Sequence, residues 1–113
     1  MECVFCRIVA GEIPSDTLYQ DDEVMAFRDI NPLAPTHVLI IPKRHIASLA
    51  DLSDDETKII GHMARVANKL ARQEGVARKG YRLVVSSGKD GGQVVPHLHM
   101  HLLAGRRLSD RLC

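Results

Sequence analysis

Three histidines alternate with large apolar residues near the end of the chain, in the segment His97-Leu98-His99-Met100-His101-Leu102-Leu103. In a β-strand successive side chains point to opposite faces, so the imidazoles would line one surface and the apolar residues the other. Neighbouring imidazoles would stand about 7 Å apart, at about 3.3 Å of rise per residue. This spacing suits a small anion or a metal ion. The pattern predicts a strand with core on one face and chemistry on the other.

Other apolar patterns predict a short helix over residues 4–10 and one long helix over 53–75. Ser53 and Glu56 form a capping box, apolar residues recur at helical spacing, and Gly75 is a natural C′ residue. Short β-prone runs, separated by turn residues, predict further strands over 17–20, 23–29, 37–41 and 81–85. Early connections are short and no βαβ unit repeats, so the expected fold is α+β: a five-stranded antiparallel meander with the two helices.

The length of 113 residues fits one domain over 1–113, with its core at about 3–105 and a short, loose basic tail after Gly105. Fifteen basic and fourteen acidic residues give a net charge of +1, which argues against a nucleic-acid partner. No apolar run approaches the ~20 residues that span a bilayer, and no signal peptide is recognisable, so we expect no membrane partner and a cytoplasmic location. Cys3, Cys6 and Cys113 are an odd set with one close pair, which favours cytosolic metal or redox chemistry over disulfides.

Several motifs together resemble the histidine triad family, over about residues 3–105. They are the His-x-His-x-His segment itself and four others: Phe27-Arg28-Asp29-Ile30, Ala34-Pro35-Thr36-His37, Ile41-Pro42-Lys43-Arg44-His45 and Asp90-Gly91-Gly92-Gln93. The chain is most similar to the small nucleotide-binding, phosphoramidase-type branch.

A neutral imidazole, with an ordinary pKa of about 6.5, is a good nucleophile near pH 7. The resemblance implies that His99 attacks phosphorus, forming a nucleotidyl-histidine that water then cleaves. It also implies that a backbone carbonyl fixes the tautomer of His99 and that His101 stabilises charge or protonates the leaving amine. His37 is either a hydrogen-bond partner of the triad or a buried structural histidine.

The resemblance extends to the substrate. It implies that Asp29 binds the ribose hydroxyls; by itself, Asp29 would more often be a strand-end cap. An apolar base slot, which ordinary core packing explains equally well, would consist of Phe5, Ile8, Phe27 and Ile30. Glycines 88, 91 and 92 let backbone N–H groups turn toward a phosphate, although most glycine-rich loops are plain turns. The other expected phosphate or sugar contacts are Ser86, Gly92, Gln93 and the Val94 amide.

A second constellation comprises Cys3, Cys6, His45 and His97. Zinc favours four thiolate and imidazole ligands, and some relatives carry such a site, so one structural zinc per chain is expected. Two buried thiols are the alternative explanation for the cysteine pair.

The leading hypothesis is an enzyme that cleaves the P–N bond of an AMP-like purine nucleoside phosphoramidate. The alternatives are a dinucleoside polyphosphate hydrolase and a non-catalytic nucleotide-binding or interaction module. The chain departs from the family pattern at Ser86, Val94 and Pro96, which puts the leaving-group preference and the rate in question. The family also implies a homodimer.

Overall fold

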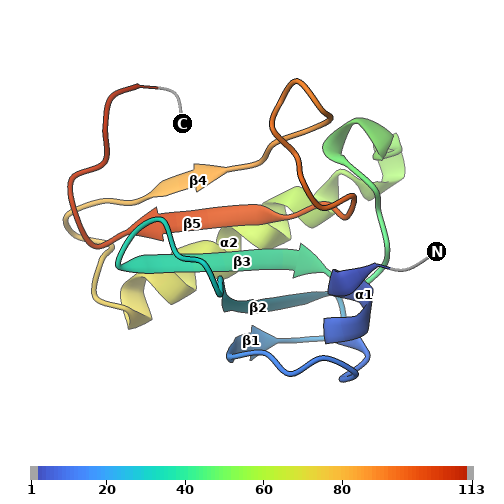
Figure 1. Ribbon diagram of the computed structural model, residues 1–113, viewed down its shortest axis with the longest axis horizontal. Helices are drawn as coiled ribbons and strands as arrows, with labels where there is room; N and C mark the ends of the chain where they lie inside the picture. The colour runs from blue at the N-terminus through green and yellow to red at the C-terminus, as the bar shows by residue number, and fades with distance from the viewer. Residues whose placement is uncertain (1–2, 112–113) are drawn as a thin grey trace.

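The computed structural model describes residues 3–111, in which five strands and two α-helices form one layered unit (Figure 1). Two 3-10 turns, Leu49–Asp51 and Asp54–Glu56, precede the long helix. The elements are α1 (Val4–Val9), β1 (Thr17–Gln20), β2 (Val24–Arg28), β3 (Thr36–Pro42), α2 (Lys58–Gln73), β4 (Arg82–Val84) and β5 (Met100–Ala104). Cys113 lies outside the described residues.

All neighbouring strands are antiparallel, in the order β1-β2-β3-β5-β4. The predicted α+β class, the five antiparallel strands and both helices are therefore confirmed. The predicted meander is correct only for β1, β2 and β3. After β3, α2 carries the chain to the edge of the sheet and leaves the position next to β3 open. β4 then forms the edge of the sheet, and β5 returns between β3 and β4 (Figure 1).

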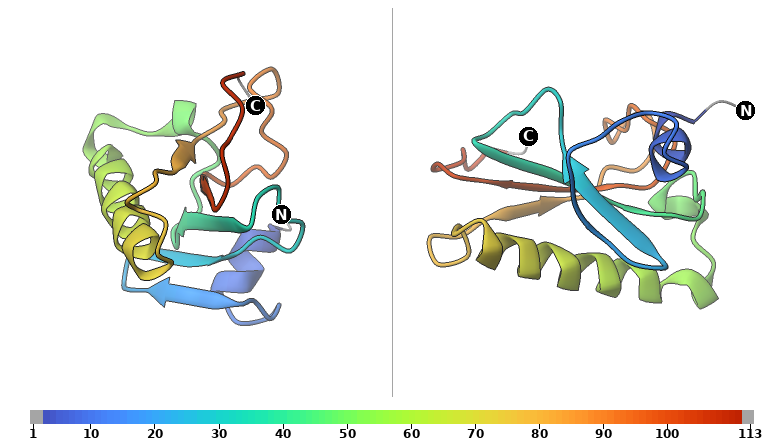
Figure 2. Two further views of the ribbon diagram at one scale, coloured as in Figure 1. Left: turned by 90° about the vertical axis from the view of Figure 1, so that its left-hand side faces the viewer. Right: turned by 90° about the horizontal axis from the view of Figure 1, so that it is seen from below.

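The two faces of the sheet have different coverings. α2 lies along one face, as Figure 2 shows, and buries Met63, Val66, Ala67 and Leu70 against alternate residues of β2, β3 and β5. α1 packs on the opposite face near the ends of β2 and β3. Because β3 is covered on both sides, all seven of its residues are buried.

The ends of α2 follow the local signals. Gly75 has φ +74° and closes a Schellman motif, since the Val76 amide donates to Ala71 O and the Gly75 amide donates to Arg72 O. At the other end, the Ser53–Glu56 capping box begins a 3-10 turn, and the α-helix starts only at Lys58. The predicted helix thus contains a bent first turn.

The histidine strand begins later than the alternation predicts. Strand pairing starts at Met100; before it, the His97 amide donates to Val95 O, which closes a tight turn centred on Pro96. The predicted apolar face of this segment is confirmed, because Leu98, Met100 and Leu102 are buried against α2. No helix in residues 3–111 is long and apolar enough to cross a bilayer.

The basic tail is attached to the sheet within the described part of the chain. Arg106 Nη2 donates to Leu33 O at 3.2 Å, and Arg82 Nη2 donates to Ser109 O at 2.6 Å. The expectation of a loose tail therefore does not hold for residues 106–109.

Candidate active site and metal cluster

His99 is buried, and its hydrogen bonds define which nitrogen is basic. Its Nδ1 lies 2.7 Å from the carbonyl oxygen of His97, which can only accept a hydrogen bond. The proton of the neutral ring therefore sits on Nδ1, and Nε2 keeps its lone pair. Within residues 3–111 no hydrogen-bond partner of Nε2 is found. His99 thus presents an unengaged nitrogen nucleophile, held in one tautomer by the main chain.

His101 and His37 form the second part of the site. The Leu33 amide donates to His37 Nδ1 at 3.0 Å, so the neutral ring carries its proton on Nε2. That Nε2 lies 2.9 Å from His101 Nδ1 and 3.4 Å from Asp29 Oδ2. His101 Nδ1 therefore accepts a hydrogen bond, and its own proton is on Nε2. The predicted neighbourhood of His37 and the triad is present in the structure.

The site disfavours cationic imidazoles. Burial, followed by the charges of His99 and His37, lowers the pKa of His101 to about 4. Burial also lowers the pKa of His37, although Asp29 opposes the shift. At pH 7 both rings are neutral, so His101 acts as a hydrogen-bond donor through Nε2 rather than as a standing positive charge.

The expected apolar slot is only partly assembled from core residues. Phe5 and Phe27 meet edge to face at 5.7 Å between ring centroids, and Ile8 packs beside them. Phe5 also contacts the His99 ring, at 5.2 Å. Ile30 stands apart on the loop after β2 and is 90% exposed. Three of the four residues therefore share one cluster close to the histidines, and Ile30 is not part of that cluster.

The glycine loop is largely hydrogen-bonded within itself. The Gly88 amide donates to Gln93 Oε1, the Gly92 amide to Lys89 O, and the Gln93 amide to Gly88 O. A Cβ at Gly91 would stand 2.5 Å from Ser87 O, so the loop requires glycine there. These amides do not form the open anion nest that the sequence suggested.

Gln93 fastens this loop rather than facing outward. Its Nε2 donates to Ala47 O at 2.7 Å and to Val95 O at 3.0 Å. The Val94 amide has no acceptor within residues 3–111 and remains the best candidate for a phosphate contact, while the Val94 side chain is 89% exposed. Ser86 is half-buried and has no hydrogen-bond partner in the same part of the chain.

The four predicted metal ligands lie together. One ligand atom from each of Cys3, Cys6, His45 and His97 falls within 4.8 Å of all the others. His97 Nε2 bonds to Pro42 O at 2.8 Å, which places the ring proton there and leaves a lone pair on Nδ1. That Nδ1 lies 3.3 Å from Cys3 Sγ, and His45 Nδ1 lies 3.3 Å from Cys6 Sγ. Two thiols and two imidazole nitrogens fit the ligand set that zinc prefers.

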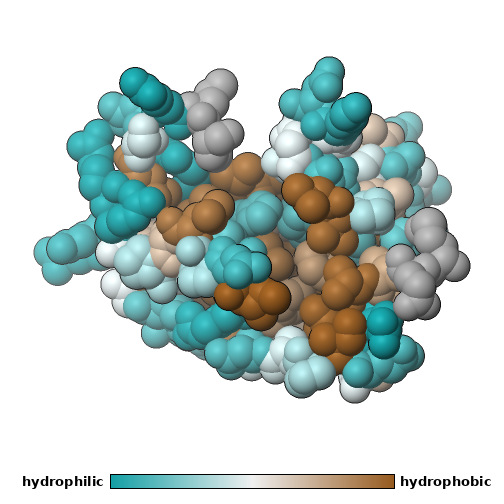
Figure 3. All heavy atoms as spheres, in the orientation of Figure 1, coloured by the Kyte–Doolittle hydropathy of each residue, from teal (hydrophilic) through white to brown (hydrophobic). Residues whose placement is uncertain are grey.

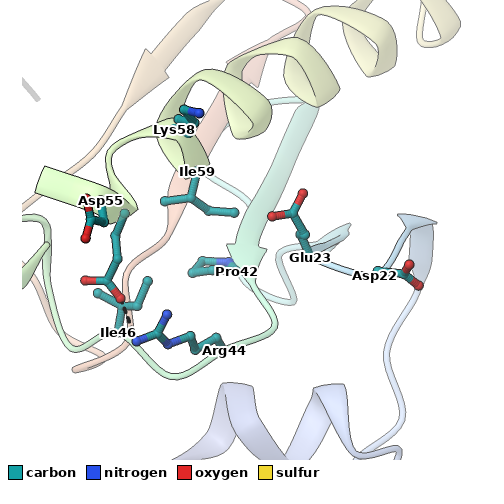
Figure 4. A pocket seen from close by; sticks show the side chains of 9 residues that line it. Asp22, Glu23, Pro42, Arg44, Ile46, Asp55, Lys58 and Ile59 are labelled. Carbon is teal, nitrogen blue, oxygen red and sulfur yellow. Dashed lines mark ion pairs between the residues drawn. The ribbon is translucent and has the colours of Figure 1, made fainter. Parts of the chain in front are cut away.

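A separate hollow of about 340 Å³ lies beside the N-terminal end of α2 (Figure 4). Pro42, Ile46 and Ile59 form its apolar part. Its rim is charged, and Arg44 pairs there with Glu56 at 2.8 Å. None of the histidines lines it, so it is not part of the candidate active site.

The comparisons with known proteins agree with this geometry. The family model of the HIT domain matches residues 10–108 of the sequence. The chain belongs to the histidine triad (HIT) family. It is 52% identical to the purine nucleoside phosphoramidase of Escherichia coli K12 over 111 residues, which are 98% of this chain and 93% of the relative.

Two solved structures extend the comparison. A histidine triad protein from Clostridium difficile superposes with a TM-score of 0.96 at 48% identity, covering 99% of this chain and 97% of that one. A Zn-bound histidine triad family protein from Mycobacterium smegmatis superposes with a TM-score of 0.80 at 31% identity, covering 100% of this chain and 81% of that one.

Sequence reasoning missed the backbone groups that organise this HIT site. The Leu33 amide and the Pro42 carbonyl determine the tautomers of His37 and His97, yet neither depends on a distinctive side chain. The position of Pro42 directly after the predicted strand, close to His45, was the only available hint. The substrate contact predicted for Gln93 stays a prediction; in the structure its side chain bonds to the Gly88 amide, Ala47 O and Val95 O.

Proposed function

We propose that this chain is a HIT hydrolase that cleaves the P–N bond of a purine nucleoside phosphoramidate through a covalent nucleotidyl-His99 intermediate. One observation carries the proposal: the His97 carbonyl holds the His99 proton on Nδ1, which leaves the Nε2 lone pair unengaged. The 52% identity to a purine nucleoside phosphoramidase supports the substrate class.

In this mechanism His99 Nε2 attacks phosphorus, the N–P bond to histidine forms, and the P–N bond to the amine breaks. The leaving nitrogen takes up one proton. His101 is the proposed donor in its cationic form, which the negative charge of the bound phosphoramidate would favour. Water then attacks the nucleotidyl-histidine: the oxygen–phosphorus bond forms, the bond to His99 breaks, and one water proton passes to His101, which releases AMP and restores the lone pair on His99. The hydrogen bond from His37 keeps the His101 proton on the nitrogen that would face the substrate.

The substrate would lie across the exposed part of this face. Asp29 follows β2 and would bind the ribose hydroxyls through its carboxylate. Phe5, Ile8 and Phe27 would form the wall of the base slot, with Ile30 closing it from the rim. The Val94 amide would donate to a phosphate oxygen.

The decisive experiment follows the covalent intermediate of His99. Wild-type protein mixed rapidly with adenosine 5′-phosphoramidate and quenched should gain the mass of one adenylyl group, on the peptide that holds residue 99. His99→Ala should lack this adduct and lose at least about 10³-fold in turnover, because no other group can take over as nucleophile. AMP binding should survive in this variant. An adduct on another residue, or substantial turnover by His99→Ala, would refute the assignment.

The other two functions remain measurable alternatives. Faster cleavage of a dinucleoside polyphosphate than of the phosphoramidate would favour a dinucleoside polyphosphate hydrolase. A non-catalytic nucleotide-binding module is the other alternative. The exposed Val94 side chain motivates it, as does Ser86, which has no hydrogen-bond partner within residues 3–111. Tight AMP binding without any turnover would identify it.

We also propose that Cys3, Cys6, His45 and His97 hold one structural zinc ion. A bound zinc would supply no reactive group here, because all four ligands come from the protein and the site is closed. Its effect would be to fix α1 to the segments around His45 and His97. Reduced thiols fit a reducing compartment, so we propose a cytoplasmic location.

A homodimer is the proposed assembly. β4 is a short strand at the edge of the sheet, and an edge strand favours pairing with a second copy. Sedimentation equilibrium at micromolar concentration should give twice the chain mass, and a monomer would contradict the proposal.

A further inference from the structure

The loop between β2 and β3, residues 29–35, lies directly beside the candidate active site. Asp29 is its first residue, and His37 is the second residue of the strand that follows it. Within residues 3–111, no main-chain group of residues 31–35 bonds to another main-chain group. Pro32 and Pro35 also have no N–H to donate. Side chains therefore hold this loop in its conformation.

Three side chains supply the hydrogen bonds of the loop. Asp29 Oδ1 accepts from the Asn31 amide at 2.8 Å. His37 Nδ1 accepts from the Leu33 amide at 3.0 Å. The third is Arg106, whose Nη2 donates to Leu33 O at 3.2 Å. Leu33 is thus held at its amide by His37 and at its carbonyl by Arg106, which is the only partner from outside the loop and its following strand in the described part of the chain.

These hydrogen bonds form a circuit that starts and ends on β5. Arg106 is the second residue after β5, and it bonds to Leu33. The Leu33 amide bonds to His37, whose Nε2 lies 2.9 Å from Nδ1 of His101. His101 is itself a residue of β5. A side chain of the tail is therefore connected, through one loop residue and one histidine, to the proposed proton donor.

Gly105 brings Arg106 to the loop. Its φ is +98°, a conformation that favours glycine, and a Cβ at this position would stand 2.7 Å from Pro35 Cβ. The chain therefore leaves β5 by turning closely over Pro35, and this turn places Arg106 beside Leu33. Figure 1 shows the start of the tail next to the loop before β3, at the left-hand end of the sheet.

Polar contacts, rather than apolar burial, fix this part of the tail. Residues 105–107 are exposed, and Figure 3 shows predominantly hydrophilic side chains at this end of the molecule. The Arg106 guanidinium donates to Leu33 O and to Arg107 O, the latter at 3.1 Å. It pairs with no carboxylate within residues 3–111. Both of its contacts are thus main-chain carbonyls, which it holds in place through separate N–H donors.

The contact at Leu33 is important because the neutral His37–His101 pair has two possible proton arrangements. In the first, His37 Nε2 donates to His101 Nδ1, and His101 presents an N–H at Nε2. In the second, His101 Nδ1 is the donor, and its Nε2 presents a lone pair. The Leu33 amide selects the first, because it donates to His37 Nδ1 and excludes a proton there. Asp29 Oδ2, 3.4 Å from His37 Nε2, favours the same arrangement over a longer distance.

We propose that Arg106 is a positioning residue for the proposed hydrolysis, acting through Leu33 and His37 on the proton arrangement of His101. Only the kinetic consequence rests on the proposed function, because the arrangement already exists in the free protein. The role is internal to one chain and requires no free surface. It is therefore compatible with the proposed homodimer.

The first test observes the tautomers in the free protein. Long-range proton–nitrogen NMR spectra distinguish protonated from unprotonated imidazole nitrogens. In wild type, Nδ1 of His37 and of His101 should be unprotonated and both Nε2 atoms protonated. In Arg106→Gln the signals of both rings should move toward an average of the two arrangements. The matched control is Arg107→Gln, which removes the next arginine and its exposed pair with Asp110, and it should keep the wild-type spectrum.

The second test measures turnover of adenosine 5′-phosphoramidate. Arg106→Gln should lower kcat about 5- to 10-fold, because a fraction of the molecules then holds the second arrangement. KM should change less than about twofold, since Asp29 keeps its bonds to the Asn31 amide and to His37 O. Arg106→Lys, which retains one donor group, should recover part of kcat. In the His37→Phe background, Arg106→Gln should change kcat less than about twofold, because the two residues act in series.

Three results would overturn the proposal. They are an Arg106→Gln spectrum identical to wild type, an equal effect of Arg107→Gln, and a full additional loss of kcat in the His37→Phe background. Failure of the proposed function has a different signature. If Arg106→Gln alters the tautomers but wild type does not turn over the phosphoramidate, the hydrolase assignment is wrong and the positioning of His101 by Arg106 stands.

Discussion

Two clusters of ionisable side chains flank His99, and both have the composition of a metal site. One contains Cys3, Cys6, His45 and His97; the other contains Asp29, His37 and His101. In each, the ligand atoms lie within 4.8 Å of one another. Distance alone does not distinguish them, but the hydrogen bonds of their histidines do.

In the first cluster the ring proton of His97 is directed away from the thiols. Pro42 O accepts it on Nε2, so the Nδ1 lone pair points into the cluster. In the second, the Leu33 amide donates to His37 Nδ1, which forces the proton onto Nε2, the atom that faces His101. A metal bound at His37 Nε2 would have to displace this proton. If the proton moved to Nδ1, that N–H would face the Leu33 amide, and two hydrogen-bond donors would oppose each other. The comparison teaches that one backbone contact decides between a metal ligand and a proton donor.

The largest expected effect separates the clusters by metal content. Cys6→Ser should lower the zinc content of the purified chain from about one to near zero and reduce the Tm by several degrees, since a structural zinc contributes to folding free energy. Asp29→Asn, the matched change in the other cluster, should leave the zinc content at about one. Elemental analysis and thermal melts check both. A second zinc lost with Asp29→Asn would show that the two clusters are alike.

The next effect concerns the tautomer of His101. His37→Phe removes the hydrogen bond to Nδ1 while filling most of the buried space, so turnover should fall about 10- to 100-fold, with a smaller change in KM. Zinc content should not change. Unaltered kcat would show that the 2.9 Å contact does not position His101.

A pH effect of intermediate size follows from the same cluster. The folded-state pKa of His101 is about 4, below its ordinary value of 6.5, so between these values the unfolded chain binds more protons. The stability that neutral His101 contributes is present above pH 6.5 and lost as the pH falls toward 4, by on the order of 1–2 kcal/mol. Urea unfolding at pH 7 and pH 5 should give a smaller difference for His101→Gln than for wild type. Equal differences would contradict the low pKa.

The smallest effect concerns the loop that precedes the first cluster. Gln93→Glu keeps an acceptor for the Gly88 amide but loses both donors from Nε2, to Ala47 O and Val95 O. Stability should fall by about 1 kcal/mol, because the two lost hydrogen bonds are only partly buried. Gln93→Met, which loses all three bonds, should fall further. Wild-type stability with reduced substrate affinity would instead favour direct contact of Gln93 with the substrate.

Patterns in the sequence were sufficient where side chains decide the outcome. The period of α2, the positive φ at Gly75 and the facing of Leu98, Met100 and Leu102 followed from spacing and residue type. The gathering of Cys3, Cys6, His45 and His97 was expected from the family resemblance and is present in the geometry.

Features that depend on the main chain were less accessible. The position of β4 at the sheet edge depends on the path of a connection, which local patterns do not specify. The late start of β5 and the closed glycine loop arise from backbone hydrogen bonds around Val95 and Gly88. The tautomers of three histidines depend on carbonyls and an amide of the main chain, which every residue type can supply.

The six-residue helix α1 has a consequence for how the protein would behave when zinc is scarce. Phe5 lies between the two thiol positions and packs against both His97 and His99. One short segment would thus serve both as a wall of the proposed base slot and as half of the proposed metal site. Removal of zinc by a chelator would loosen that wall, so the affinity for nucleotides would fall before the sheet unfolds. The zinc supply would thereby govern ligand retention.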